Sequence, residues 1–194
     1  MVKIGVIAIQ GDVSEHVQSI GRAMDILGIE GSVITVKRVR DVENLNGVLI
    51  PGGESTTITR IMNKSGLTEK IRKMYAEESI AIMGTCAGCV ILAKEVEGGE
   101  VRGLELMNMK VMRNAFGRQK ESFETFVDVK GLEEPYPAVF IRAPIIEKVW
   151  DDCEVVAKLG DKIVGARQDT LLALSFHPEL TEDHRIYKLF FDML

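Results

Sequence analysis

The sequence predicts an α/β fold: one domain, residues 1–194, with a mostly parallel sheet, helices on both faces and an antiparallel extension. Three observations predict it. Short, nearly continuous apolar runs alternate with helical segments in the first half, as in parallel sheets that are buried on both faces. Strand-like runs separated by short Gly, Pro and acidic turns fill the second half, which favours antiparallel pairing. The 194 residues suit one domain, and no repeat or linker divides them.

The composition excludes several classes of protein. With 46% hydrophobic and 27% charged residues, the chain is neither disordered nor collagen-like. The net charge of −5 and the lack of a basic cluster argue against binding to nucleic acid or to a membrane surface. The longest apolar stretch, residues 80–93, is too short to span a bilayer, and residues 1–12 do not resemble a secretory leader. Three cysteines are too few for a disulfide scaffold, so we expect a reducing, cytoplasmic environment.

In the first half, apolar periodicity and glycine positions set the expected elements. Gly11 ends the first strand, and a helix capped by Asp12 or Ser14 runs until Gly28. Ser55 opens a further helix after the turn that begins at Pro51. The expected strands are residues 3–9, 32–36, 47–50 and 79–83, and the expected helices are residues 14–27, 55–62 and 67–75.

In the second half, β-rich runs follow one another closely. The expected strands are residues 104–111, 123–129, 138–141, 153–159, 162–168 and 170–176. Residues 89–96 can form a helix, and residues 182–194 form a closing helix with Ile186, Leu189 and Phe190 on its apolar face.

A candidate nucleophile lies at residues 84–88, Gly-Thr-Cys-Ala-Gly, between a strand and a helical segment. A strand that turns sharply into a helix crowds its backbone, so side chains at positions 84 and 88 would clash. Cys86 then projects beside the free N–H groups of a helix start, which favours its thiolate form. The N–H of Ala87 is a candidate donor to an oxyanion hole.

Three other interpretations of Cys86 stay open. It can be an inert buried thiol at a strand end, as free cysteines commonly are. With Cys89 it has the C-x-x-C spacing of a redox pair, although such a pair does not need the flanking glycines. A zinc site would require further ligands, and Cys153 without a paired partner is a poor one.

The candidate base is His177, which follows an apolar strand and precedes Pro178 and Glu179. Proline holds the segment extended, so the side chains at 177 and 179 point toward one side and Glu179 can orient the imidazole. A solvated turn is the alternative. We expect His184 to face solvent, and the role of His16 on the first helix stays open between a surface group and a partner contact.

A second glycine-rich turn, residues 50–57, also joins a strand to a helix. The pair Gly52 and Gly53 lets the backbone approach a ligand or flip a peptide plane. The turn lacks the lysine of a phosphate-binding P-loop. A plain helix cap by Ser55 is the structural alternative, whereas the N–H of Gly53 opposite Ala87 would complete an oxyanion hole.

Taken together, residues 51–57, 84–88 and 176–179 resemble class I, triad-type glutamine amidotransferases. Residues 10–11, 113–119 and 140–144 narrow the resemblance to the glutaminase subunits of pyridoxal 5′-phosphate synthase. The matching blocks occur in order over nearly the whole chain, and the resemblance implies a flavodoxin-like three-layer sandwich. Cys89 departs from the family, which usually carries Leu or Met there, and this bears on packing rather than chemistry.

The resemblance implies hydrolysis of L-glutamine to L-glutamate and ammonia through a γ-glutamyl thioester, with no cofactor and no metal. Cys86 takes the place of the nucleophile, His177 that of the base and Glu179 that of its orienting group. The positions of the oxyanion hole match Gly53 and Ala87. The family's glutamine-binding positions match Gly53, Glu54, Ser55, Arg113, Ile141 and Arg142.

The resemblance also implies a partner. In this family the ammonia passes to a separate barrel-shaped synthase subunit, which combines it with ribose 5-phosphate and glyceraldehyde 3-phosphate, and the glutaminase is nearly inactive until it docks. Two other classes of function stay open from the residues alone. One is a cysteine hydrolase or chaperone of related architecture, and the other is a binding module with an inert Cys86.

Overall fold

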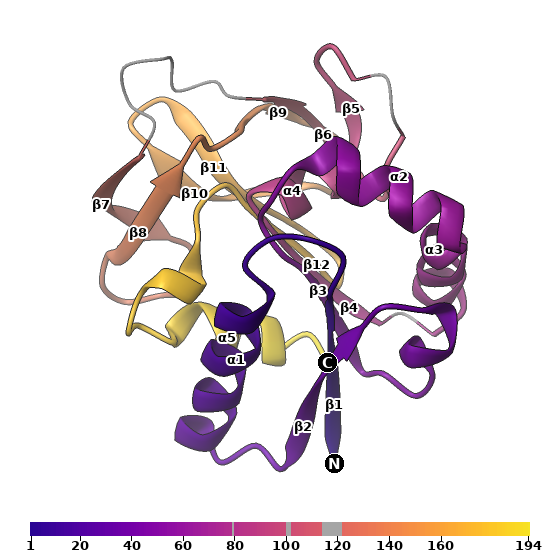
Figure 1. Ribbon diagram of the computed structural model, residues 1–194. Helices are drawn as coiled ribbons and strands as arrows, with labels where there is room; N and C mark the ends of the chain where they lie inside the picture. Colours follow the sequence, from indigo (N-terminus) through magenta and orange to yellow (C-terminus); the bar gives the residue numbers. More distant parts are fainter. Residues whose placement is uncertain (79, 100–101, 114–121) are drawn as a thin grey trace.

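The computed structural model describes residues 1–78, 80–99, 102–113 and 122–194. At the centre of the fold lies a parallel sheet (Figure 1). Its strands, in spatial order, are β2 (Gly31–Val36), β1 (Val2–Ile7), β3 (Gly47–Ile50), β4 (Ala81–Thr85) and β12 (Leu171–Leu174). Each neighbouring pair among these five strands is parallel. The first four of these strands are the parallel core that the alternating apolar runs predict, whereas β12 comes from the second half, where antiparallel pairing was expected, and pairs in parallel with β4.

An antiparallel extension continues the sheet beyond β12. It comprises β11 (Lys162–Gln168), β10 (Glu154–Leu159), β7 (Ser122–Val129) and β8 (Tyr136–Ile141). A branch from β11 adds β9 (Ile145–Val149), β6 (Met107–Met112) and β5 (Ala93–Val96). The expected fold class, a parallel sheet with an antiparallel extension, is therefore confirmed.

Helices cover both faces of the parallel core (Figure 1). One face carries α2 (Ser55–Ser65), α3 (Leu67–Glu78) and α4 (Ala87–Leu92), and the other carries α1 (Val13–Leu27) and α5 (Arg185–Phe191). The side chains of β3 alternate between the two cores: Val48 and Ile50 pack in the first, and Leu49 packs in the second. Short 3₁₀ turns, η1 (Val39–Val42) and η2 (Pro178–Leu180), complete the described elements.

The ends of α1 and α2 follow the glycine positions. Gly28 and Gly66 adopt left-handed conformations, with φ of 66° and 80°, directly after these helices. The beginnings differ from expectation. Asp12 precedes α1 without a side-chain cap bond, and Glu54, not Ser55, caps α2 by accepting from the N–H groups of Thr56 and Thr57.

Two expectations for the middle of the chain were wrong. The helix expected over residues 89–96 ends at Leu92, and Ala93–Val96 forms β5. Tertiary pairing ends the helix, because the carbonyls of Ile91 and Leu92 accept from the N–H groups of Leu104 and Leu106. The strand β9 was not expected, and the expected start of β4 at Ser79 lies outside the described residues.

The fold brings four loops to one edge of the sheet. In parallel sheets, ligands bind beyond the carboxyl ends of the strands. Here the segments after β1, β3, β4 and β12 carry Asp12, Gly53, Cys86 and His177, and all four residues line one cavity. In the described part of the chain, no helix combines the length and apolar character needed to cross a bilayer.

Candidate active site

The candidate nucleophile lies in the tight turn between β4 and α4. Cys86 has a φ of 48°, in the left-handed region that side chains other than glycine rarely adopt. Its N–H donates to the Leu174 carbonyl on β12 at 2.8 Å, which fixes the turn to the neighbouring strand. A Cβ at Gly84 would lie 2.5 Å from the Gly88 carbonyl group, and one at Gly88 would lie 2.1 Å from the Ile50 carbonyl oxygen. The steric requirement for both glycines is confirmed.

Cys86 is 8% exposed and lines the cavity beyond the sheet edge. Its Sγ lies 3.8 Å from the carbonyl oxygen of Ile141, to which it can donate a weak hydrogen bond. Arg142, the next residue, has a φ of 42° and lines the same cavity. Strained residues of this kind cluster at functional sites.

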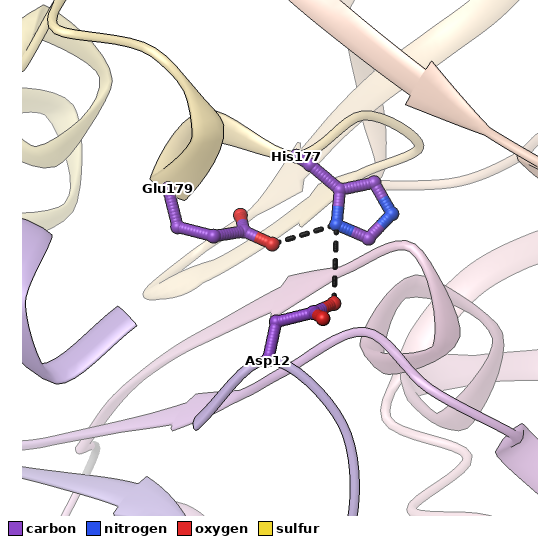
Figure 2. Close-up of side chains that lie close together, drawn as sticks. All are labelled: Asp12, His177 and Glu179. Carbon is purple, nitrogen blue, oxygen red and sulfur yellow. Dashed lines mark hydrogen bonds and ion pairs between the residues drawn. The ribbon is translucent and has the colours of Figure 1, made fainter. Parts of the chain in front are cut away.

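The candidate base and its orienting group lie on the loop after β12 (Figure 2). The Nδ1 atom of His177 lies 2.6 Å from Oε1 of Glu179 across Pro178. The N–H of His177 also donates to the Val139 carbonyl at 2.8 Å, which ties the loop to β8. The solvated turn is excluded, because His177 is 4% and Glu179 8% exposed.

The other ring nitrogen of His177, Nε2, is buried and makes no hydrogen bond of good geometry with a described residue, although the Cys86 side chain lies near enough to raise the pKa of the ring. A neutral imidazole carries one proton, and the short contact to Glu179 favours that proton on Nδ1. The lone pair of Nε2 is then free to accept a proton from a nucleophile in the cavity. This is the arrangement of a nucleophile, a base and an orienting carboxylate.

The pKa values of His177 and Glu179 are both raised, but for opposite reasons. Burial alone would lower the pKa of His177, but the side chains of Cys86 and Glu179 raise it to about 10. Burial raises the pKa of Glu179, and its hydrogen bond with His177 opposes that shift. The imidazolium form of His177 is therefore stabilised by an acidic group on each side.

Asp12 is a third polar group at this histidine (Figure 2). Its Oδ2 lies 3.5 Å from Nδ1 of His177, and its side chain is partly exposed to the cavity. The sequence indicated Asp12 only as a helix cap. A Cβ at Gly52 would lie 2.6 Å from the ring of His177 and 2.8 Å from Oδ2 of Asp12, so a glycine at 52 makes room for both groups.

The cavity has a volume of about 350 Å³, within the usual range for small-molecule sites. It brings together catalytic, oxyanion and glutamine-binding candidates from distant parts of the sequence. The candidates that line it are Cys86, His177, Gly53, Ala87, Glu54, Ser55, Arg113, Ile141 and Arg142. Glu179 lies behind His177 rather than on the wall. The wall residues that the sequence did not assign to the site are Gln10, Asp12, Val90 and Pro144.

Two of the glutamine-binding candidates are already engaged with α2. The Glu54 carboxylate accepts from the N–H groups of Thr56 and Thr57 and from the Thr57 hydroxyl, which lowers its pKa. Nη1 of Arg113 donates to Oγ1 of Thr56 at 3.1 Å. The rest of the 113–119 motif, residues 114–119, lies outside the described residues.

The competing interpretations of the cysteines lose support. All three cysteines are free, and burial raises the pKa of Cys89 far above its ordinary value, which is unsuitable for an exchanging redox pair. Burial raises the pKa of Cys153 to about 11. In the described residues, the one group with metal-ligand spacing is Asp12, His177 and Glu179, and it contains no cysteine.

The other two histidines differ from expectation. His16 is not at the surface: it is fully buried in α1, and its Nε2 lies 3.2 Å from Oε2 of Glu179. Its helical spacing to Ile20 and Ala23 was the available sequence signal, because it places the ring on the apolar face of α1. His184 is half-buried beside Tyr187 instead of facing solvent.

Comparisons with known proteins show which family the chain resembles. The model of the SNO glutamine amidotransferase family matches residues 6–194. A curated protein of Thermococcus gammatolerans, named pyridoxal 5′-phosphate synthase subunit PdxT, is 53% identical over 98% of both chains. A protein of the same name from Halalkalibacterium halodurans is 48% identical over 100% of this chain and 95% of its own. A solved structure described as a glutamine amidotransferase aligns with a TM-score of 0.88 at 44% identity, over 98% of this chain and 97% of that chain.

Proposed function

The chain belongs to the SNO glutamine amidotransferase family, and we propose that it hydrolyses L-glutamine with Cys86 as nucleophile, His177 as general base and Glu179 as the group that orients His177. The observation that carries these assignments is the placement of Cys86 and His177 on one cavity wall, with Glu179 bonded to the far nitrogen of the imidazole. The curated relatives of similar length are named as subunits of pyridoxal 5′-phosphate synthase.

Because the pKa of His177 is raised to about 10, Nε2 already holds the proton given up by the Cys86 thiol, and in the first half-reaction the sulfur attacks the side-chain amide carbon of glutamine. The carbonyl oxygen becomes an oxyanion. Nε2–H then protonates the amide nitrogen, the C–N bond breaks and ammonia leaves, so that a γ-glutamyl thioester remains on Cys86.

In the second half-reaction, Nε2 takes a proton from water as the hydroxyl attacks the thioester carbon. The C–S bond breaks, glutamate leaves and the proton on Nε2 returns to the sulfur. Throughout, Nδ1 of His177 donates to Glu179, which keeps the imidazole in the tautomer that accepts at Nε2 and stabilises the imidazolium when it forms.

The main-chain N–H groups of Gly53 and Ala87 are our candidates for the oxyanion hole. Both residues line the cavity beside Cys86. Gly53 has a φ of 137°, which a residue with a side chain rarely adopts, so the peptide at this position can turn its N–H toward the cavity only while it is glycine. Loss of one such donor typically costs about 10²–10³ in rate.

We assign the α-carboxylate of glutamine to Arg113, because a guanidinium group matches a carboxylate with two parallel hydrogen bonds. Ser55, Ile141 and Arg142 complete the wall around the substrate. Because the Glu54 carboxylate caps α2, we assign the contribution of Glu54 to its main chain.

The chain acts as one subunit of pyridoxal 5′-phosphate synthase, and we propose that it delivers its ammonia to a barrel-shaped synthase subunit in the cytoplasm. Free glutaminase activity would waste glutamine, so we expect docking to switch the activity on. The Gly52–Gly53 peptide is the proposed hinge, since it borders both His177 and the cavity.

The test is ammonia release from glutamine by this chain with and without the synthase subunit. A large stimulation of ammonia release by the synthase supports the scheme, whereas equal rates would contradict activation by docking.

A diazo-ketone analogue of glutamine, followed by mass-spectrometric mapping, identifies the nucleophile. An adduct on Cys86 supports the assignment, and an adduct elsewhere contradicts it. A cysteine hydrolase without glutamine specificity would give no protection of Cys86 by glutamine.

A further inference from the structure

A second histidine lies buried behind the proposed triad. His16, in α1, has no exposed surface. Its Nε2 lies 2.9 Å from Oγ1 of Thr85 and 3.2 Å from Oε2 of Glu179, and its Nδ1 lies 3.5 Å from the Tyr187 hydroxyl. One ring atom thus faces both the residue that precedes Cys86 and the carboxylate that orients His177.

The protonation state of His16 follows from its surroundings. Burial, and then the charge of His177, lower its pKa to about 3, so the ring is neutral at any working pH of the enzyme. A neutral imidazole has one N–H donor and one acceptor nitrogen. The contact between His16 and Glu179 is therefore not an ion pair, and whether it is attractive depends on which ring nitrogen of His16 carries the proton.

The neighbours of His16 favour a proton on Nε2. With the proton on Nδ1, the lone pair of Nε2 would face the carboxylate oxygen of Glu179 at 3.2 Å, which is repulsive. With the proton on Nε2, the N–H donates to Oγ1 of Thr85 at 2.9 Å and lies beside Oε2 of Glu179, 3.2 Å from Nε2, while Nδ1 can accept from the Tyr187 hydroxyl. Either arrangement gives each ring nitrogen a hydroxyl partner, but only the second places an N–H instead of a lone pair beside the carboxylate.

The Glu179 carboxylate needs such a donor. Its Oε1 is bonded to His177, while Oε2 is buried without a well-aligned hydrogen bond in the described part of the chain. A buried carboxylate oxygen that lacks a donor costs free energy and leaves the group free to rotate or to take up a proton. Nε2 of His16 lies 3.2 Å from this oxygen and is placed to supply the donor.

We propose that His16 is a positioning residue of the glutaminase reaction: its Nε2–H donates to Oε2 of Glu179 and holds Oε1 against Nδ1 of His177. The inference rests on the proposed function and deepens it. His16 does not touch the substrate. It acts on His177 through Glu179. The same ring nitrogen also contacts Oγ1 of Thr85, the residue before Cys86, so His16 links Glu179 to the turn that carries the nucleophile.

Removal of this donor narrows the pH range of the reaction. Without the donor, the pKa of Glu179 rises, so the acidic limb of the profile moves to higher pH. A carboxylate that is held less firmly against Nδ1 also stabilises the imidazolium of His177 less, so the basic limb moves to lower pH. The titratable groups that face Glu179 are His177, His16, Asp12, Tyr136 and Tyr187. A role in packing alone would lower the whole profile without moving either limb.

The test compares three variants in complex with the synthase subunit. His16→Leu lowers kcat about 10- to 100-fold, the value of a hydrogen bond to a charged group, with little change in KM for glutamine, and narrows the pH profile of kcat/KM. His16→Gln, whose amide nitrogen lies near the position of Nε2, restores most of kcat and the width of the profile. Ile20→Val, one turn along the same buried face of α1 and without a polar side-chain atom, is the matched control and changes neither.

A measurement on the unmodified protein keeps the proposal open to refutation if His16→Leu fails to fold. Imidazole ¹⁵N chemical shifts of His16 should report a neutral ring with the proton on Nε2 from pH 5 to 9. A proton on Nδ1, or a ring that titrates in this range, overturns the proposal. So does a His16→Leu variant with normal kcat, or equal losses in the Leu and Gln variants with unmoved pH limbs.

These outcomes are distinct from a failure of the proposed function. If the unmodified complex releases no ammonia from glutamine, the proposed function fails, while the tautomer measurement still decides the contact between His16 and Glu179.

Discussion

Nδ1 of His177 lies 2.6 Å from Oε1 of Glu179, two residues further along the chain, and both side chains are buried. Pro178 between them fixes the backbone in a 3₁₀ turn, so the chain itself brings the base and its orienting carboxylate together. The nucleophile of the proposed triad comes from a turn more than eighty residues earlier. Assembly of the site therefore depends on one local contact and one long-range contact.

The first prediction concerns Cys86. Replacement by alanine removes the only proposed covalent carrier, so ammonia release from glutamine in the presence of the synthase falls to the background rate. The matched control is Cys153→Ala, another buried free cysteine, which keeps its activity. Near-normal turnover in Cys86→Ala would remove the thioester from the mechanism.

The second prediction concerns the pH profile of glutamine hydrolysis. Glu179→Gln removes the charge that helps to hold the pKa of His177 near 10, so the basic limb moves to lower pH. The rate falls by up to about 10⁴-fold, the loss seen when the orienting carboxylate of a serine-protease triad becomes an amide. The control is Glu182→Gln, at an exposed glutamate three residues away, and its pH profile should match that of the unmodified protein. An unchanged basic limb in Glu179→Gln would contradict the orienting role.

The third prediction links the same histidine to stability. The pKa of His177 is raised on folding from its ordinary 6.5 to about 10, so the folded state binds this proton more tightly than the unfolded chain. Its contribution to the free energy of unfolding is complete below pH ~6.5 and is lost as the pH rises toward 10. Urea unfolding at several pH values measures this slope, which should be smaller in Glu179→Gln. Equal slopes in the two proteins would contradict the coupling.

The fourth prediction uses two glycines with opposite outcomes. Gly88→Ala places a Cβ 2.1 Å from the Ile50 carbonyl oxygen, so it lowers the free energy of unfolding by about 1–3 kcal/mol. Gly21→Ala, in α1 with nothing beyond its own stretch of the helix within 4 Å of the new Cβ, raises it by about 0.5–1 kcal/mol. Chemical denaturation compares the two directly, and a neutral Gly88→Ala would disprove the steric account of the nucleophile turn.

The fifth prediction concerns substrate binding. Arg113→Lys keeps the charge but loses the paired donors for a carboxylate, so KM for glutamine rises about tenfold while kcat changes little. Arg60→Lys, an exposed arginine on α2, leaves KM unchanged and serves as the control. Steady-state kinetics with the synthase present measures both values. A normal KM in Arg113→Lys would assign the α-carboxylate to another group.

Local steric rules were readable from the sequence. The apolar runs of the first half predicted four of the parallel strands, and Gly28 stands directly after the helix that it was expected to end. The spacing of Gly84 and Gly88 predicted a turn in which side chains would clash. Each of these features depends on residues close together in the chain, so the sequence by itself determined them.

Long-range packing decided the rest. The segment 93–96 became a strand because β6 pairs with it, which no local pattern reveals. Asp12 turned toward His177 instead of capping α1, and His16 was buried against Glu179 by the packing of α1 on η2. Such contacts join residues far apart in the chain, and only the folded sheet sets the distances between them. The sequence by itself determined which groups could do the chemistry, and the tertiary structure decided which groups hold them in place.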